Sequence, residues 1–191
     1  MRTFWIGTLG ALGVVIVPAS GAAAQQLSEK QIAVCALTKD RSAAENFASG
    51  KLPRSAANLH DLDKVTAQGL RLLALCQEGE VRRLPTWAKL QREIRSAARK
   101  VSVTPASTAL PVVKLCKHEA EMDNGVRAPF RYQIVRETNV GRSVVTDQFY
   151  AYHPSFGSAP LPRDLSVQVP EGVQIVERCH IINSAGELAD A

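Results

Sequence analysis

Residues 112–136 read VVKLCKHEAEMDNGVRAPFRYQIVR, and this stretch decides the fold class that we expect. Residues 112–122 and 130–136 have the composition of strands, and they flank Asp123-Asn124-Gly125. Asn-Gly favours the positive backbone angles that a tight hairpin needs. Two more strand-like runs follow, at residues 144–152 and 173–182. The second half of the chain is therefore predicted to form a small, mainly antiparallel β-sheet.

The residues before this hairpin indicate helices. Ser28 and Gln31 fit a capping box, and a helix of about five turns is expected to follow and to stop at Gly50. A second apolar stripe covers residues 58–78, and a third helix is expected from Thr86 to about Val101. The predicted fold class is α+β: a helical region of about three helices (25–104), a connector (105–111) and a β-rich region (112–191).

The first 24 residues have the form of a cleaved signal peptide. Arg2 precedes an apolar stretch at residues 4–17, and Ala22-Ala23-Ala24 provides small residues for cleavage. No later run of about 18 apolar residues is present. We therefore expect a soluble protein, periplasmic or secreted, that begins near Gln25.

Four cysteines lie in the expected mature chain, and an even number in an oxidising compartment is normally paired. Three pairings are formally possible. We favour Cys35–Cys76 and Cys116–Cys179, because each bond then lies within one region, and the first would clamp two antiparallel helices.

Charge is divided unevenly along the chain. Residues 25–110 carry 14 Lys and Arg against 8 Asp and Glu, whereas residues 111–191 carry 8 against 10. On the third expected helix one face gathers a basic set that consists of Arg92, Arg95 and Arg99, flanked by Lys89 and Lys100. Such a face can bind carboxylates or phosphates of an acidic protein, a membrane surface or an envelope polymer, or it can simply be solvated. Nucleic acid is not expected, because the protein is exported.

A second candidate surface combines aromatic residues with a proline-rich segment at residues 153–172, which we expect to be a loop. The residues of this candidate surface are Tyr150, Tyr152, Phe156 and Leu161. Strand alternation places Tyr150 and Tyr152 on one face. These side chains either anchor a protein partner or fill the core.

The sequence contains none of the common nucleophile, metal or phosphate-binding motifs. The alternative of a small periplasmic hydrolase or metal-dependent enzyme would use residues near the hairpin, namely Glu119, Glu121, Asp123 and His118, brought close to His153 or Arg131. The same acidic residues also suit the solvated face of a hairpin.

Zinc ligands are a further option at Cys116, His118, Cys179 and His180. A regular strand would place Cys179 and His180 on opposite faces, which favours a disulfide instead. We expect no metal and no cofactor.

We therefore expect an exported, non-catalytic binding protein of the cell envelope: an adaptor, inhibitor, immunity-like factor or assembly factor. Its expected partner is an envelope protein. If the basic helix makes the contact, the contact surface of that partner is acidic. The alternatives are the enzyme described above and a protein that binds an anionic polymer or a membrane surface.

Overall fold

The computed structural model describes residues 26–53, 59–101, 109–121, 125, 127–153, 157–161, 169 and 172–191. Within these residues, four helices precede six strands. The helices are α1 (Glu29–Lys39), α2 (Arg41–Ser49), α3 (Lys64–Cys76) and α4 (Trp87–Ala98). The strands are β1 (Val112–Glu121), β2 (Arg127–Thr138), β3 (Gly141–His153), β4 (Gly157–Pro160), β5 (Gln174–Ile182) and β6 (Leu188–Asp190). The α+β prediction is confirmed, and the expected signal peptide lies outside the described residues.

The single helix expected up to Gly50 is wrong, because Asp40 divides it into α1 and α2. One carboxylate oxygen of Asp40 accepts from the Ala43 amide at 3.1 Å and caps α2. The other accepts from Arg71 Nη1 of α3 at 2.7 Å. The expected capping box at Ser28 is present at the start of α1. The part of the chain that the structure describes therefore has one helix more than predicted.

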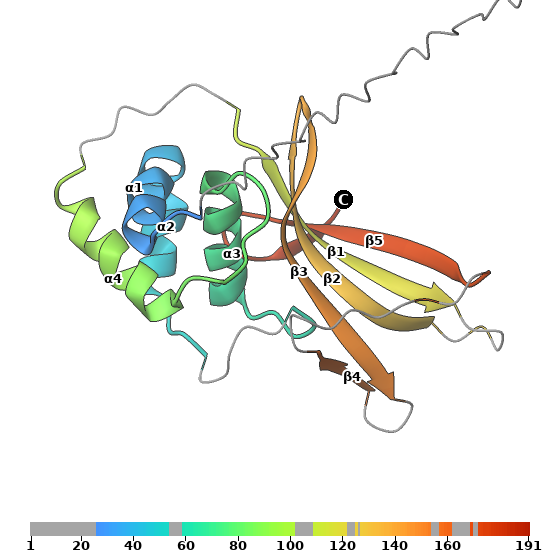
Figure 1. Ribbon diagram of the computed structural model, residues 1–191. Coiled ribbons are helices and arrows are strands. Elements are labelled where there is room, and N and C mark those ends of the chain that lie inside the picture. The colour runs from blue at the N-terminus through green and yellow to red at the C-terminus, as the bar shows by residue number, and fades with distance from the viewer. Residues whose placement is uncertain are drawn as a thin grey trace, which may run out of the picture.

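The other two helices are shorter than predicted. The Asp63 side chain accepts from the backbone amides of Val65 and Thr66, so α3 begins at Lys64. Thr86 is the N-cap of α4, as expected, and the helix ends at Ala98. Helix α4 is the helical element farthest from the sheet (Figure 1).

The sheet has the strand order β4-β3-β2-β1-β5-β6, and every neighbouring pair is antiparallel. The predicted β1–β2 hairpin is confirmed, and Gly125 has a positive φ of 76°. Strand β4 pairs with the end of β3, so part of the segment expected to be a loop is a strand. Strand β6 was not predicted, because three residues carry too little periodicity.

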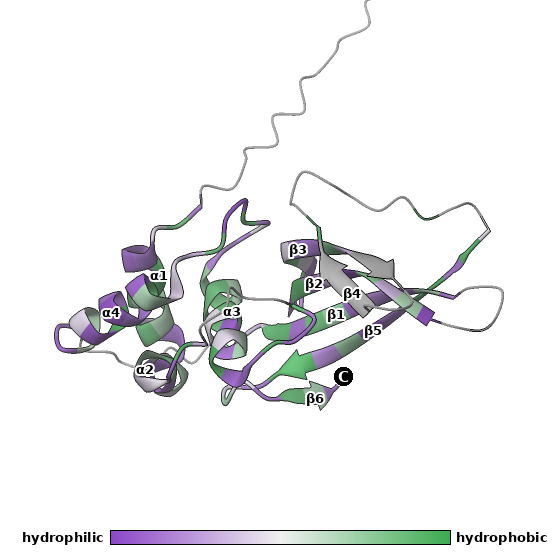
Figure 2. Cartoon of the chain, turned by 90° about the horizontal axis from the view of Figure 1, so that it is seen from below, coloured by the Kyte–Doolittle hydropathy of each residue, from purple (hydrophilic) through white to green (hydrophobic). Residues whose placement is uncertain are grey.

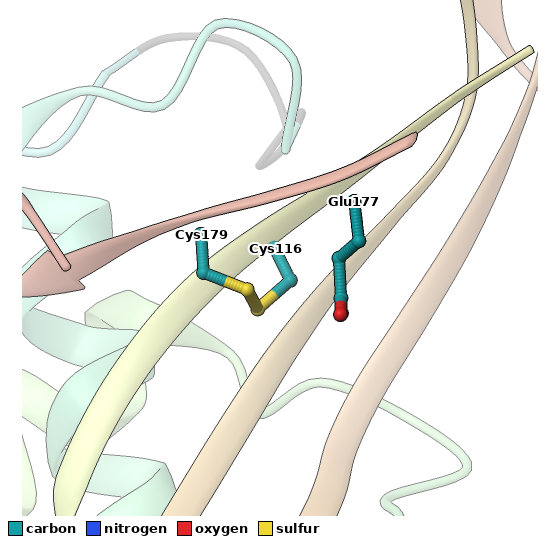
Figure 3. A group of neighbouring side chains, drawn as sticks. All are labelled: Cys116, Glu177 and Cys179. Carbon is teal, nitrogen blue, oxygen red and sulfur yellow. A yellow bond between two sulfur atoms is a disulfide. The ribbon is translucent and has the colours of Figure 1, made fainter. Parts of the chain in front are cut away.

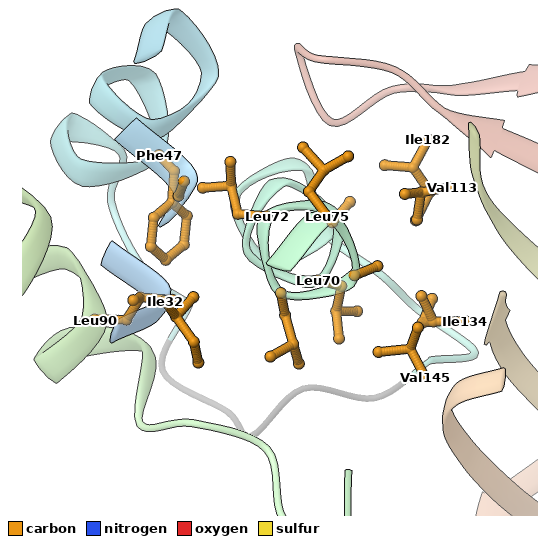
Figure 4. Packing of buried hydrophobic residues seen from close by; sticks show 14 of the residues in the cluster. Ile32, Phe47, Leu70, Leu72, Leu75, Leu90, Val113, Ile134, Val145 and Ile182 are labelled. Carbon is orange, nitrogen blue, oxygen red and sulfur yellow. The ribbon is translucent and has the colours of Figure 1, made fainter. Parts of the chain in front are cut away.

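One continuous core joins the helices to the sheet. Helix α3 lies between Ile32, Phe47 and Leu90 on one side and the sheet residues Val113, Ile134, Val145 and Ile182 on the other (Figure 4). In the hydropathy view, hydrophilic residues occupy much of α4, whereas β1 and β5 carry apolar segments interrupted by hydrophilic residues (Figure 2). The sheet therefore depends on α3 to cover its apolar face, and α4 has one face left for solvent or a partner.

Both expected disulfides are present. Cys35–Cys76 joins α1 to the end of α3 with Cα atoms 5.9 Å apart, and Cys116–Cys179 joins β1 to β5 with Cα atoms 4.0 Å apart. Two such bonds indicate an oxidising, extracytoplasmic environment. Among the described residues, no helix has the length and apolar character needed to cross a membrane.

Candidate functional site

The basic face of α4 is present as predicted. All five of its basic side chains are exposed, whereas Leu90 and Ile94 on the opposite face are fully buried. Two of the five make contacts inside the protein. Lys89 Nζ donates to Glu29 Oε2 at 2.9 Å, and this hydrogen bond lowers the pKa of Glu29. Arg95 donates to the carbonyl of Ala48 in the last turn of α2.

The remaining three, Arg92, Arg99 and Lys100, form what we call the α4 cation cluster. Among the described residues none of the three side chains makes a hydrogen bond or an ion pair. Residues 92 and 99 are two turns apart on one side of the helix, and residue 100 follows the C-cap residue Arg99, so the three charges lie on α4 and at its C-terminal end.

The acidic residues of the helical region are mostly used elsewhere. Asp40 binds Arg71, and Glu45 pairs with Arg41 at 2.8 Å. Arg41 also donates to the carbonyls of Ala98 and Val101 at 2.9 Å, and so caps the C-terminal end of α4. These acids are engaged in packing and capping, and neither of them pairs with the α4 cation cluster.

The aromatic surface is only partly where we expected it. Tyr150 is completely buried, and its hydroxyl accepts from the His60 amide at 3.1 Å and donates to Gln148 Oε1 at 2.8 Å. Its ring contacts Tyr132 edge to face with centroids 4.8 Å apart. Burial raises the pKa of Tyr150. The prediction that Tyr150 contacts a partner is therefore wrong, because the Tyr150 side chain packs into the core.

The other members of that surface stay predictions. Tyr152 is described only by its backbone in β3, and Phe156 lies outside the described residues. Leu161 is half-buried, and its amide donates to the Phe149 carbonyl at 2.8 Å. Leu161 and Phe149 line a cavity of about 270 Å³ together with Val81.

The carboxylates of the enzyme hypothesis are engaged separately. Glu119 is buried, with Oε1 at 2.6 Å from Lys117 Nζ and Oε2 at 3.7 Å from Arg178 Nε. Glu121 pairs with Arg127 at 3.1 Å. Asp123 lies outside the described residues, and His153 is described only by its backbone. The described geometry therefore gathers no carboxylate pair at the hairpin.

His118 and Arg131 do come together, as register partners on β1 and β2. A chain of contacts links them: His118 Nε2 lies 3.0 Å from Gln133 Oε1, and Gln133 Nε2 donates to Asp147 Oδ2 at 3.2 Å. Arg131 Nε donates to both oxygens of Asp147 at 3.0 Å. Arg131 also lies over the Phe149 ring, 5.1 Å from its centroid.

Glu177 extends this polar network across the sheet. It lies 3.6 Å from His118 Nε2 and accepts from Arg142, whose hydrogen bond lowers the pKa of Glu177. Every charge in the network thus has an internal partner, which favours a role in holding the strands together. The sequence carried no signal for this network, since its members are brought together by strand register.

The zinc hypothesis is not supported. Glu177 projects beside Cys116 and Cys179, and the three potential ligand atoms lie within 4.8 Å of one another (Figure 3). The two sulfur atoms are bonded to each other, so neither is available as a thiolate ligand. His180 pairs with Asp190 at 3.4 Å and is the register partner of Leu115, which lies on the core face of β1.

A different set of residues, which the sequence did not indicate, surrounds a cavity of about 750 Å³. Lys39 and Arg136 are its basic residues. Comparison with known proteins gives no further guidance, because no family model, curated protein or solved structure matches the chain.

Proposed function

We propose that this protein is an exported, non-catalytic binding protein of the cell envelope whose partner presents an acidic surface to α4. The export step rests on the signal-like residues 1–24 and on the two disulfides. Adaptor, inhibitor, immunity-like factor and assembly factor are all compatible with this proposal.

The α4 cation cluster is the observation that carries the proposal. Three exposed cations on α4 and at its C-terminal end have no acidic partner in the described residues, while neighbouring Lys89 and Arg95 are tied to the helical region. The buried face of α4 fixes the helix against α1 and α2, so the cations are presented from a rigid element. Arginine suits this role, because its planar guanidinium binds a carboxylate through two parallel hydrogen bonds.

Binding is favoured over catalysis by the state of the hairpin residues. Glu119 and Glu121 are each held by a neighbouring cation, and His118 is part of a paired network. The described residues therefore bring neither carboxylate beside a second carboxylate or a free histidine that could share acid–base work. The sheet therefore serves as a scaffold in this proposal.

The test is the double charge reversal Arg92→Glu/Arg99→Glu in the tagged, exported protein. In-cell crosslinking followed by mass spectrometry should recover a stoichiometric envelope protein with the wild type and lose it with this variant. The matched control is Lys30→Glu/Lys51→Glu, which makes the same change of net charge at exposed residues outside the cluster. Folding should be nearly unchanged in both, since exposed substitutions usually alter stability by about 0.5 kcal/mol or less.

Crosslinks that survive equally in both variants would show that α4 is only a solvated face. Binding of the purified protein to vesicles of anionic lipid, lost at high salt and in the α4 variant, without any protein partner, would replace the proposal by a membrane-surface function.

A further inference from the structure

The 750 Å³ cavity lies where the C-terminal end of α1 meets the start of β1 and the end of β2. Its volume is within the range of about 300–1,000 Å³ that is usual for small-ligand sites. One wall is apolar and is formed by residues 109–112. Leu110 and Val112 of this wall are 40% and 41% exposed, although both are large hydrophobic residues. The cavity thus offers apolar surface that the described protein does not cover.

Arg136 lines this cavity and carries an unsatisfied buried donor. It is the register partner of Val113, which is 1% exposed and belongs to the core. Its Nε is buried and has no hydrogen-bond partner, and its guanidinium makes no ion pair among the described residues. Native proteins rarely leave a buried donor unmet, because its lost hydration is not repaid. An anion that binds in the cavity would pair with the guanidinium charge of Arg136.

Lys39 places a second positive charge at the same cavity. Its Nζ donates to the Leu75 carbonyl at 2.7 Å, which leaves two of its three N–H groups for other acceptors. Desolvation, and next the charge of Arg136, lower the pKa of Lys39. The nearby Glu78 acts in the opposite direction, and Glu137, which also lines the cavity, is neutralised by Lys114 at 2.7 Å. The cavity therefore keeps two cations that repel each other until an anion enters.

We infer that this cavity binds a small amphipathic anion, specifically an aliphatic carboxylate. The carboxylate accepts hydrogen bonds from Arg136 and Lys39, while the hydrocarbon chain covers the wall formed by residues 109–112. An inorganic anion would satisfy the charges but leave that wall exposed, and an alcohol would cover the wall but leave the charges unpaired. This site is independent of the α4 cation cluster, because it uses other residues and another class of ligand.

Isothermal titration calorimetry of the mature protein with decanoate, below its micelle concentration, tests the inference. We expect saturable binding and a rise in melting temperature. Acetate and 1-decanol, which each supply one half of the ligand, should bind at least about tenfold more weakly, since a charge-assisted hydrogen bond accounts for a factor of that size. Decyltrimethylammonium should not bind at the site.

Substitutions then assign the head-group contact. Arg136→Leu should weaken decanoate binding by about tenfold or more, and Lys39→Gln should weaken it by a smaller factor. Arg83→Leu, a variant of an exposed arginine outside both the cavity and α4, should bind decanoate like the wild type. Absence of decanoate binding, equal affinity for decanoate and 1-decanol, or unchanged affinity in Arg136→Leu would each overturn the inference. Because α4 is untouched by these changes, failure here leaves the proposed partner function standing.

Discussion

Replacing Asp40 should destabilise the protein far more than replacing an ordinary surface acid. Its carboxylate caps α2 and holds Arg71, and the two side chains are 14% and 11% exposed, respectively. Breaking a fully buried ion pair costs about 3–5 kcal/mol, and a lost N-cap costs about 1 kcal/mol. With the ion-pair term reduced for partial exposure, we expect Asp40→Ala to lower the free energy of unfolding by about 3–4 kcal/mol.

Asp40→Asn separates the two contributions, because asparagine keeps an oxygen that can cap Ala43 but not the charge that holds Arg71. It should lose about 1 kcal/mol less than Asp40→Ala. Urea unfolding followed by circular dichroism measures both values, and Glu45→Ala is the control, since the Arg41–Glu45 pair is 40% and 50% exposed. The control should change stability by about 0.5 kcal/mol or less. If Asp40→Ala were no worse than Glu45→Ala, the helix break would not depend on this contact.

Two further predictions concern titration and covalent state. Burial raises the pKa of Tyr132 to about 12 and also raises the pKa of Tyr150. An alkaline absorbance titration of the native protein should therefore show two tyrosines that ionise at unusually high pH. After unfolding, both should ionise at the usual pH of a tyrosine. Their contribution to stability should be complete below the ordinary pKa of about 10 and should be lost as the pH rises through the raised values. Peptide mapping without reduction should find Cys35–Cys76 and Cys116–Cys179, and replacing either pair by serine should cost about 4 kcal/mol in the chain-entropy model.

Local signals predicted most of the fold. The capping box at Ser28, the N-cap at Thr86 and the Asn-Gly turn act within a few residues, and each correctly places an element. The break at Asp40 escaped prediction because an aspartate between two apolar helical stretches is compatible with one long helix. What decides against that helix is Arg71, a residue on another helix, and tertiary contacts of this kind leave no mark on periodicity.

The candidate sites were harder to predict, for the same reason. The sequence showed a basic face on α4 but not that Glu29 and the Ala48 carbonyl engage Lys89 and Arg95. Tyr150 carried the same strand alternation whether it faced the core or a partner. The cavity could not be predicted from the sequence, because Lys39 and Arg136 come from opposite halves of the chain. They meet only when the end of α1 lies beside the end of β2.

Arg71 and Arg136 show how a structural cation differs from a candidate ligand-binding one. Each projects from an element that contributes to the core, and each carries a charge that costs free energy to desolvate. Arg71 is neutralised by Asp40 at 2.7 Å, whereas the buried Nε of Arg136 finds no acceptor. Substituting Arg71 with methionine should therefore destabilise the protein, because the Asp40 carboxylate would lose its partner. Substituting Arg136 with leucine leaves no acidic group without a partner, so in the absence of ligand the stability should be unchanged or raised. If Arg136→Leu instead destabilised the protein without ligand, Arg136 would have a structural partner and its cavity would need no anion.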